Sequence, residues 1–158
     1  MKYTRLTKEQ LESLHQEFSM FLAAQSIDKI QWDQIKASQP DVAEQILDVF
    51  SDVVWEGVLE KAQYLESHAT QQLFLFHLAS ENMQVIIIKT EASINFTTQE
   101  GRQWLQEHLE GEEVELLSGT RNYSAHKKQD IFQLIQQGAF ISKGELYQQL
   151  QPFVDQKK

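Results

Sequence analysis

The side chains with which this sequence could build acid–base or metal chemistry are five histidines and 23 carboxylates, since it contains no cysteine. Glu12 and His15 have the Glu-x-x-His spacing that di-metal carboxylate bundles place on each of two helices. The spacing occurs once in the chain, and His15 borders the apolar positions of its own segment. We therefore interpret His15 as a histidine at the edge of a helix core, and we predict no metal site and no cofactor.

His77 is a stronger candidate, because it lies within the otherwise apolar segment 72–79. A buried histidine needs hydrogen-bond partners, so this ring is either satisfied inside a core or lines a pocket. The second reading predicts a small-molecule-binding protein or enzyme with a pocket between a hairpin and the helices, and with His77 in the pocket lining.

Carboxylates recur at four-residue steps further toward the N-terminus, at Glu44, Asp48, Asp52 and Glu56. On a helix these residues form one acidic column. A divalent cation needs ligands that converge on a point, whereas this column runs about 18 Å along the helix axis. The column is therefore either a solvated outer face or a surface that meets a basic partner.

Trp55 and Leu59 interrupt this column and fall on its side of the helical wheel. Tryptophan is enriched at the binding hot spots of protein interfaces. We predict that Trp55 and Leu59 anchor another protein, while Asp48, Asp52 and Glu56 set the charge of that partner. The alternative is that this side of the helix packs inside the protein.

No motif in the chain predicts catalysis. The polar segment 118–122 is followed by His126, Lys127 and Lys128 and could bind a small anion, but it lacks the glycine-rich phosphate-loop pattern. Nucleophile-elbow, zinc-protease and dinucleotide fingerprints are also missing from the sequence. We therefore assign no catalytic residue and regard enzymatic activity as uncertain and not favoured.

The composition narrows the class of partner and the compartment. Lys and Arg total 14 against 23 Asp and Glu, a net charge of −9 that repels nucleic-acid phosphates. No apolar signal region follows the N-terminal Met1. The longest apolar runs, 73–76 and 85–88, are far shorter than the roughly 20 residues that span a bilayer. We expect an acidic, soluble, cytoplasmic protein with no nucleic-acid or membrane partner.

Helices must position most of these residues in the N-terminal half. Thr7 with Gln10, and Asp28 with Gln31, are capping boxes that predict helix starts. A third and longest helix is expected over residues 40–66. Its core side on a helical wheel collects eight apolar residues: Val42, Ile46, Leu47, Val49, Phe50, Val53, Val54 and Val58.

The periodicity changes after residue 71. Segments 72–79 and 83–90 are rich in aromatic and branched residues and are separated by three residues, which predicts a β-hairpin over about 72–90. Both faces of the hairpin are apolar, so we expect both to be covered. A short strand is predicted over about 114–117, and helices follow toward the C-terminus.

These elements predict an α+β fold, with a helical N-terminal half packed on a small, mostly antiparallel sheet and C-terminal helices. We expect a single domain over residues 1–158, with possible lobes at 1–70 (helical) and 71–158 (α/β).

Several spaced blocks are shared with a known family: 2–11, 26–29 with 32–33, 48–52 with 54–56, and Gly138 with 141–147. On these blocks the chain resembles a family of short, uncharacterised proteins from Bacteroidetes, especially flavobacteria, over nearly its whole length. The resemblance implies a bacterial domain of unknown function and transfers no catalytic residue. Together with the acidic charge and the missing motifs, it favours a cytoplasmic protein–protein interaction domain without catalytic activity; the oligomeric state is left open.

Overall fold

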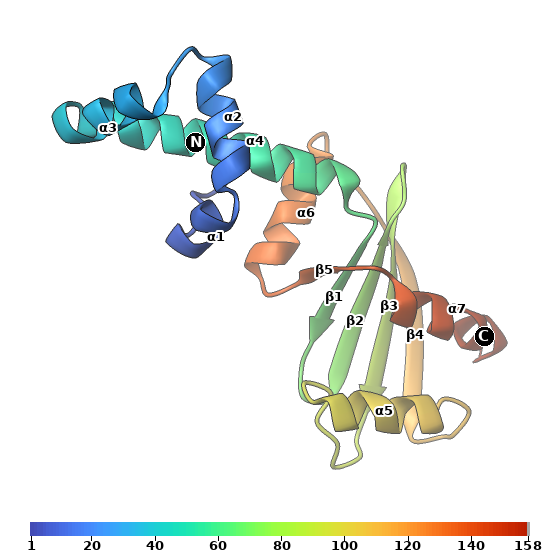
Figure 1. Cartoon of the computed structure of the whole chain (residues 1–158). Helices are drawn as coiled ribbons and strands as arrows, with labels where there is room; N and C mark the ends of the chain where they lie inside the picture. The colour runs from blue at the N-terminus through green and yellow to red at the C-terminus, as the bar shows by residue number, and fades with distance from the viewer. Residues whose placement is uncertain (158) are drawn as a thin grey trace. The chain divides into compact units, whose positions relative to one another are not determined.

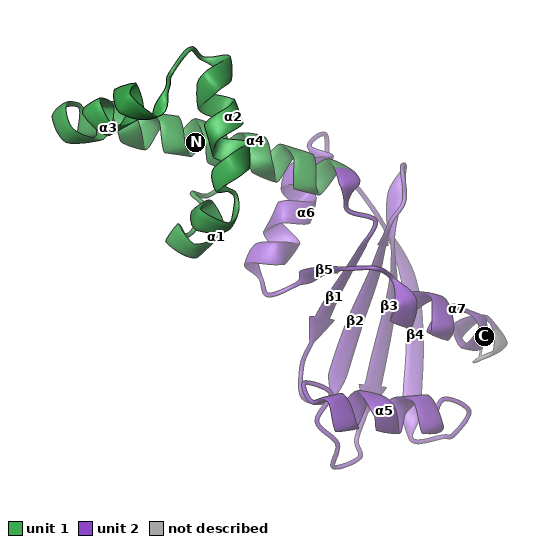
Figure 2. Ribbon diagram, in the orientation of Figure 1, with its two compact units in different colours: residues 1–60 green, residues 61–158 purple. Residues whose placement is uncertain are grey.

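The computed structural model describes residues 1–157, and the chain divides into two compact units. Unit 1 comprises Met1–Glu60 and unit 2 comprises Lys61–Lys158, as Figure 2 shows in green and purple. The assignment of the whole chain to one domain stays a prediction.

Unit 1 is helical. Its elements are α1 (Lys8–Ser13), α2 (His15–Ala24), α3 (Lys29–Ser38) and α4 (Pro40–Lys61). Both predicted capping boxes are confirmed, because the Thr7 side chain accepts from the Gln10 N–H and the Asp28 side chain from the Gln31 N–H.

The helix that starts after Thr7 ends at Ser13, and α2 begins at His15 after a break at Leu14. Two side chains compete for helix carbonyl groups at this point: the Ser13 hydroxyl donates to Gln10 O at 2.8 Å, and His15 Nδ1 lies 3.2 Å from Glu12 O. Such local bonds offer the backbone an alternative to the helical ladder.

An aromatic cluster joins three helices of unit 1. The Phe18 ring lies edge-on to Trp32 of α3 at 5.2 Å between centroids and 5.0 Å from Phe50 of α4. Phe21 lies 5.3 Å from the same Phe50 ring. Phe50 is 3% exposed, so one side of α4 is covered by the other helices of its unit.

The polarity expected of α4 was partly wrong. Of the valines assigned to its core side, Val42, Val49, Val53 and Val58 are exposed, whereas the buried residues of the helix are Ala43, Phe50, Ser51 and Leu59. The helical wheel identified the apolar half of α4. The other helices of the unit, however, bury only the part of that half around Phe50 (the Phe50 edge).

Unit 2 contains a five-stranded antiparallel sheet, as Figure 1 shows. Its strands are β1 (Tyr64–His68), β2 (Gln72–Leu78), β3 (Asn82–Thr90), β4 (Val114–Asn122) and β5 (Phe140–Ser142), in the order β4-β3-β2-β1-β5. The predicted α+β class and the β2–β3 hairpin are confirmed. The predicted strand over 114–117 runs on to residue 122, and the end of the helix predicted over 40–66 is strand β1 instead.

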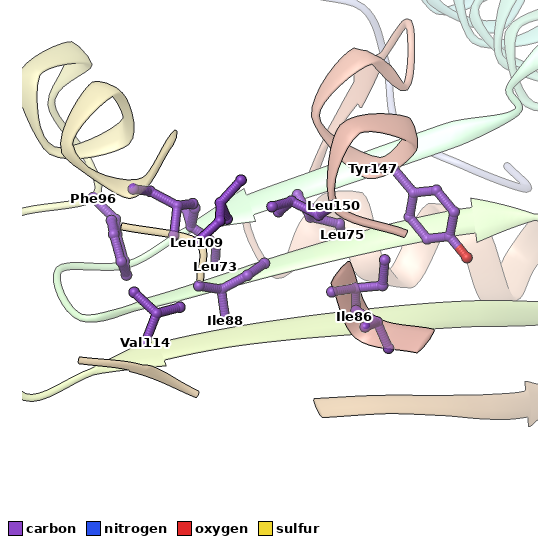
Figure 3. Packing of buried hydrophobic residues seen from close by; sticks show 11 residues of the cluster. Leu73, Leu75, Ile86, Ile88, Phe96, Leu109, Val114, Tyr147 and Leu150 are labelled. Atoms are coloured by element: carbon purple, nitrogen blue, oxygen red, sulfur yellow. The ribbon is translucent and has the colours of Figure 1, made fainter. Parts of the chain in front are cut away.

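Three helices complete unit 2: α5 (Gln99–Glu107), α6 (Lys127–Gln136) and α7 (Glu145–Lys157). One face of the sheet carries the main core, to which α5 and α7 contribute. Figure 3 shows this core with Phe96 and Val114 at one end and Tyr147 at the other. Its members are Leu73, Leu75, Ile86, Ile88, Phe96, Leu105, Leu109, Val114, Tyr147, Leu150 and Val154.

The opposite face of the sheet is less completely covered than we expected. Leu65, Leu78 and Met83 are buried on it, but Phe74 is only half-buried and Leu117 is 37% exposed. The α6 helix supplies two buried side chains, Ile131 and Phe132.

Candidate functional site

The acidic face of α4, defined as Asp48, Asp52 and Glu56, binds the beginning of the same chain. Arg5 Nε lies 2.6 Å from Asp48 Oδ1, and Arg5 Nη1 lies 4.0 Å from Glu44 Oε1. The hydrogen bond from Arg5 lowers the pKa of Asp48 below its ordinary value. The column that could have met a basic partner therefore meets a basic residue of its own unit.

The other two carboxylates of the acidic face also bind the beginning of the chain. Asp52 accepts hydrogen bonds from the backbone N–H groups of Lys2 and Tyr3, at 2.8 and 3.0 Å. Glu56 Oε1 accepts from Lys2 Nζ at 2.6 Å and from Tyr3 Oη at 2.9 Å. Burial and the hydrogen bond to Glu56 raise the pKa of Tyr3 to about 12.

A buried hydrogen bond attaches Leu6, which follows these residues, to α4. The Leu6 N–H donates to Ser51 Oγ at 3.0 Å, and that hydroxyl donates to Leu47 O at 2.8 Å. Ser51 is fully buried and Leu6 is 6% exposed. Residues 2–6, called the N-terminal segment below, are thus attached to α4 by both charge and burial.

The two predicted anchors are not exposed side chains. Leu59 is 2% exposed, and Trp55 is half-buried with its Nε1 atom away from solvent. Partner binding by Trp55, Leu59 and the acidic face stays a prediction.

Another face of α4 is apolar and open. Val49 and Val53 are 55% and 53% exposed, Val42 is 39% exposed and Ile46 is half-buried. These four residues, called the apolar stripe below, follow steps of four, three and four residues, which places them along one line of the helix. Sequence reasoning found the residues but assigned them to the core.

In unit 2, His77 belongs to a cluster of aromatic and amide side chains. Its ring stacks on Tyr64 at 4.9 Å and lies 5.6 Å from Tyr147 of α7. His77 Nδ1 is 3.2 Å from Gln84 Oε1, and Tyr147 Oη donates to the same oxygen at 3.3 Å. Because an amide oxygen only accepts, His77 Nδ1 is the donor in this hydrogen bond.

The strand register explains this cluster. Ser142, Tyr64, His77, Gln84 and Thr120 stand directly opposite one another on β5, β1, β2, β3 and β4. Directly opposite residues in antiparallel strands point to the same face. The register thus forms a row of polar and aromatic side chains beside the apolar core.

A groove of about 370 Å³ adjoins the cluster between α7 and strands β3 and β4. Gln84 and Tyr147 line it together with Ser118, Thr120 and Asp155. Burial, and then the nearby Tyr64 and Asp155, raise the pKa of Tyr147 above its ordinary value. Its hydroxyl is a hydrogen-bond donor at neutral pH. Hydroxyl, amide and carboxylate groups of this kind suit a polar, neutral or cationic small molecule.

A further polar cluster was missed in the sequence. His68 Nε2 lies 2.8 Å from Glu66 Oε1, and Arg102 Nη1 lies 3.3 Å from His68 Nδ1 and donates to Phe96 O at 2.9 Å. Since arginine can only donate, His68 Nδ1 accepts and Nε2–H donates to Glu66. Glu66 and His68 alternate along β1, but the sequence pattern predicts a helix as far as residue 66.

Two further observations concern the described residues, 1–157. Within that range no group of three or more His, Asp or Glu side chains is arranged to hold a metal ion. Among the helices of the same range, none combines the length and the apolar character needed to cross a membrane.

Comparison with known proteins gives one finding. No curated protein and no solved structure matches the chain. A family model described as a family of unknown function (DUF6495) matches residues 1–155. Because this match spans nearly the whole sequence, the chain belongs to that family of unknown function.

Proposed function

We propose that this protein is a non-catalytic protein–protein interaction domain that binds a helix of a partner protein along α4. The observation that carries the proposal is the apolar stripe, in which Val49 and Val53 are each more than half exposed. Monomeric proteins rarely leave such a line of branched apolar side chains in water without a use for it.

The chemistry of α4 favours a basic amphipathic helix as the partner. The steps of four, three and four residues match the spacing at which one helix packs its side chains between those of another. Unit 1 holds eleven Asp and Glu against five Lys and Arg within residues 1–60. This excess of negative charge on unit 1 is complementary to a partner helix with Lys or Arg side chains beside its apolar face.

The test is the substitution Val53→Asp, with Val58→Asp as matched control. Val53 and Val58 are both exposed valines of α4, but Val58 lies outside the stripe. A partner is first identified by co-purification from the native cell, and its minimal binding segment is then titrated with each variant. We expect Val53→Asp to abolish binding of a basic helical segment and Val58→Asp to retain it. Equal binding by wild type and Val53→Asp would refute the proposal.

The acidic face of α4 is a second binding surface in this proposal. The N-terminal segment occupies Asp48, Asp52 and Glu56, so a partner binds these carboxylates only after that segment leaves. In the double variant Lys2→Ala/Arg5→Ala, binding at the acidic face should become tighter, whereas binding at the apolar stripe should not change. The comparison therefore separates the two faces.

A second candidate function is small-molecule binding in the groove beside α7. It is favoured by the hydrogen-bonded connection from Gln84, which lines the groove, to His77. A ligand found in a metabolite panel should raise the melting temperature of the wild type. Ser118→Trp, which fills the groove, should abolish that rise, and Ser124→Trp outside it should not.

The cytoplasmic location, the flavobacterial origin and the absence of a nucleic-acid partner stay predictions from the sequence.

A further inference from the structure

The two edge strands of the sheet in unit 2 differ in length. The edge strand β5 has three residues, whereas β4 at the other edge has nine, from Val114 to Asn122. A strand at a sheet edge presents a row of N–H and C=O groups to solvent, and proteins usually keep such edges short or interrupt them. β4 contains neither proline nor an interruption of its pairing with β3.

The sequence of β4 is complementary to itself in one antiparallel register. When two copies are aligned with Ser118 opposite Ser118, residues 115–121 of the two copies face each other, and Glu115 of each copy faces Arg121 of the other. Both side chains are exposed, and in the described part of the chain no hydrogen bond or ion pair holds either of them. This register creates two identical pairs of opposite charge.

The charges beyond the strand ends agree with this register. Four of the six residues 110–115 are glutamates, whereas residues 121–128 contain Arg121, Lys127 and Lys128 and no carboxylate. Antiparallel pairing brings the acidic end of one strand beside the basic end of the other. A parallel pairing would bring like ends together, which is unfavourable.

We propose that β4 pairs with β4 of a second copy of this chain, which joins two five-stranded sheets into one. A two-fold axis that passes midway between the two Ser118 residues, perpendicular to the sheet, keeps each face of the sheet continuous. It also places the exposed Leu117 of one copy beside Gly119 of the other, where nothing lies within 4 Å of a Cβ built on that glycine. The proposal concerns unit 2 only and does not rest on the proposed function of α4.

Self-complementarity is the reason for choosing a second copy rather than a foreign peptide. An extended peptide could also add to this edge, but nothing in β4 selects its sequence. Pairing along one strand of about 30 Å makes a small interface. We therefore expect a dimer that dissociates on dilution.

The register is tested by cross-linking of the full chain, which has no cysteine of its own. Directly opposite residues have Cα atoms about 4.5 or 5.5 Å apart, within reach of a disulfide. Under mild oxidation, Ser118→Cys should give a covalent dimer. The matched control is Thr120→Cys, exposed on the same face of β4, whose two copies would be offset by about 14 Å along the strands and should remain monomeric.

The charge pairing is tested by sedimentation over a dilution series. Glu115→Arg removes two ion pairs and opposes like charges, so it should raise the dimer dissociation constant about tenfold or more. The charge swap Glu115→Arg/Arg121→Glu should restore dimerisation. Glu17→Arg, with the same change of charge on unit 1, should have no effect.

Three results would overturn the proposal. They are a monomer at every concentration, a dimer that Glu115→Arg leaves unchanged, and equally efficient cross-linking of Ser118→Cys and Thr120→Cys. The second of these would assign the dimer to another surface.

Discussion

Replacement of Gly144 by alanine should destabilise unit 2 more than any other glycine-to-alanine change at a positive φ. Gly144 has φ +81°, and a Cβ at this position would overlap the ring of Tyr64. That ring stacks on His77 at 4.9 Å, and its hydroxyl accepts a hydrogen bond from Gln148 Nε2 at 3.1 Å. The substitution therefore strains the backbone and also displaces a packed side chain.

The expected loss is about 3 kcal/mol of unfolding free energy, from a backbone contribution of about 1–2 kcal/mol together with weakened stacking and one hydrogen bond. Gly138 isolates the backbone contribution, since it has φ +113° and nothing lies within 4 Å of its built Cβ. Gly138→Ala should therefore lose only about 1–2 kcal/mol.

Urea unfolding followed by circular dichroism measures both variants. A double-mutant cycle with Tyr64→Ala completes the test, because the excess loss of Gly144→Ala should disappear once the ring is removed. A loss equal to that of Gly138→Ala, or an excess that persists without Tyr64, would refute the steric reasoning.

Three other changes have definite expected outcomes. Gly57→Ala, in the interior of α4 with nothing within 4 Å of the added Cβ, should stabilise unit 1 by about 1 kcal/mol and raise its melting temperature by about 4–8 °C. Gly101→Ala should lose about 3 kcal/mol in urea unfolding, since its Cβ would overlap the Asn95 carbonyl. Because folding raises the pKa of Tyr3, its protonated hydroxyl stabilises the folded state. This stabilisation is complete below the ordinary pKa of 10.0 and is lost as pH rises through about 12. In an ultraviolet titration, Tyr3→Phe should remove a phenol that ionises near pH 12, whereas an unchanged late ionisation would show that Tyr3 does not bind Glu56.

Local signals in the sequence predicted local structure well. The capping boxes at Thr7 and Asp28 and the β2–β3 hairpin depend on residues a few positions apart, so their geometry is encoded where it occurs. Strand β1 was missed because its five residues follow a long helical pattern without a strong break, and its pairing with β2 and β5 decides its conformation.

For a different reason, the sequence could not predict which residues of α4 are exposed and which are buried. A helical wheel separates the apolar side from the acidic side, but it does not say which neighbours cover each of them. Arg5 lies 43 residues from Asp48 in the chain, and Phe18 and Phe21 come from another helix. Those long-range contacts cover the acidic side and the Phe50 edge, and they leave the valines in solvent.

Different forces dominate association at the two proposed surfaces, so the salt dependence of binding distinguishes them. Charge pairing between Glu115 and Arg121 at an exposed strand edge is screened as ionic strength rises, so the dimer through β4 should weaken. Burial of the apolar stripe is a hydrophobic contact, which excluded salts such as sulfate strengthen. In the same sulfate series, an association that tightens therefore points to α4 of unit 1, and one that weakens points to β4 of unit 2. A single surface responsible for both associations could not respond in opposite directions.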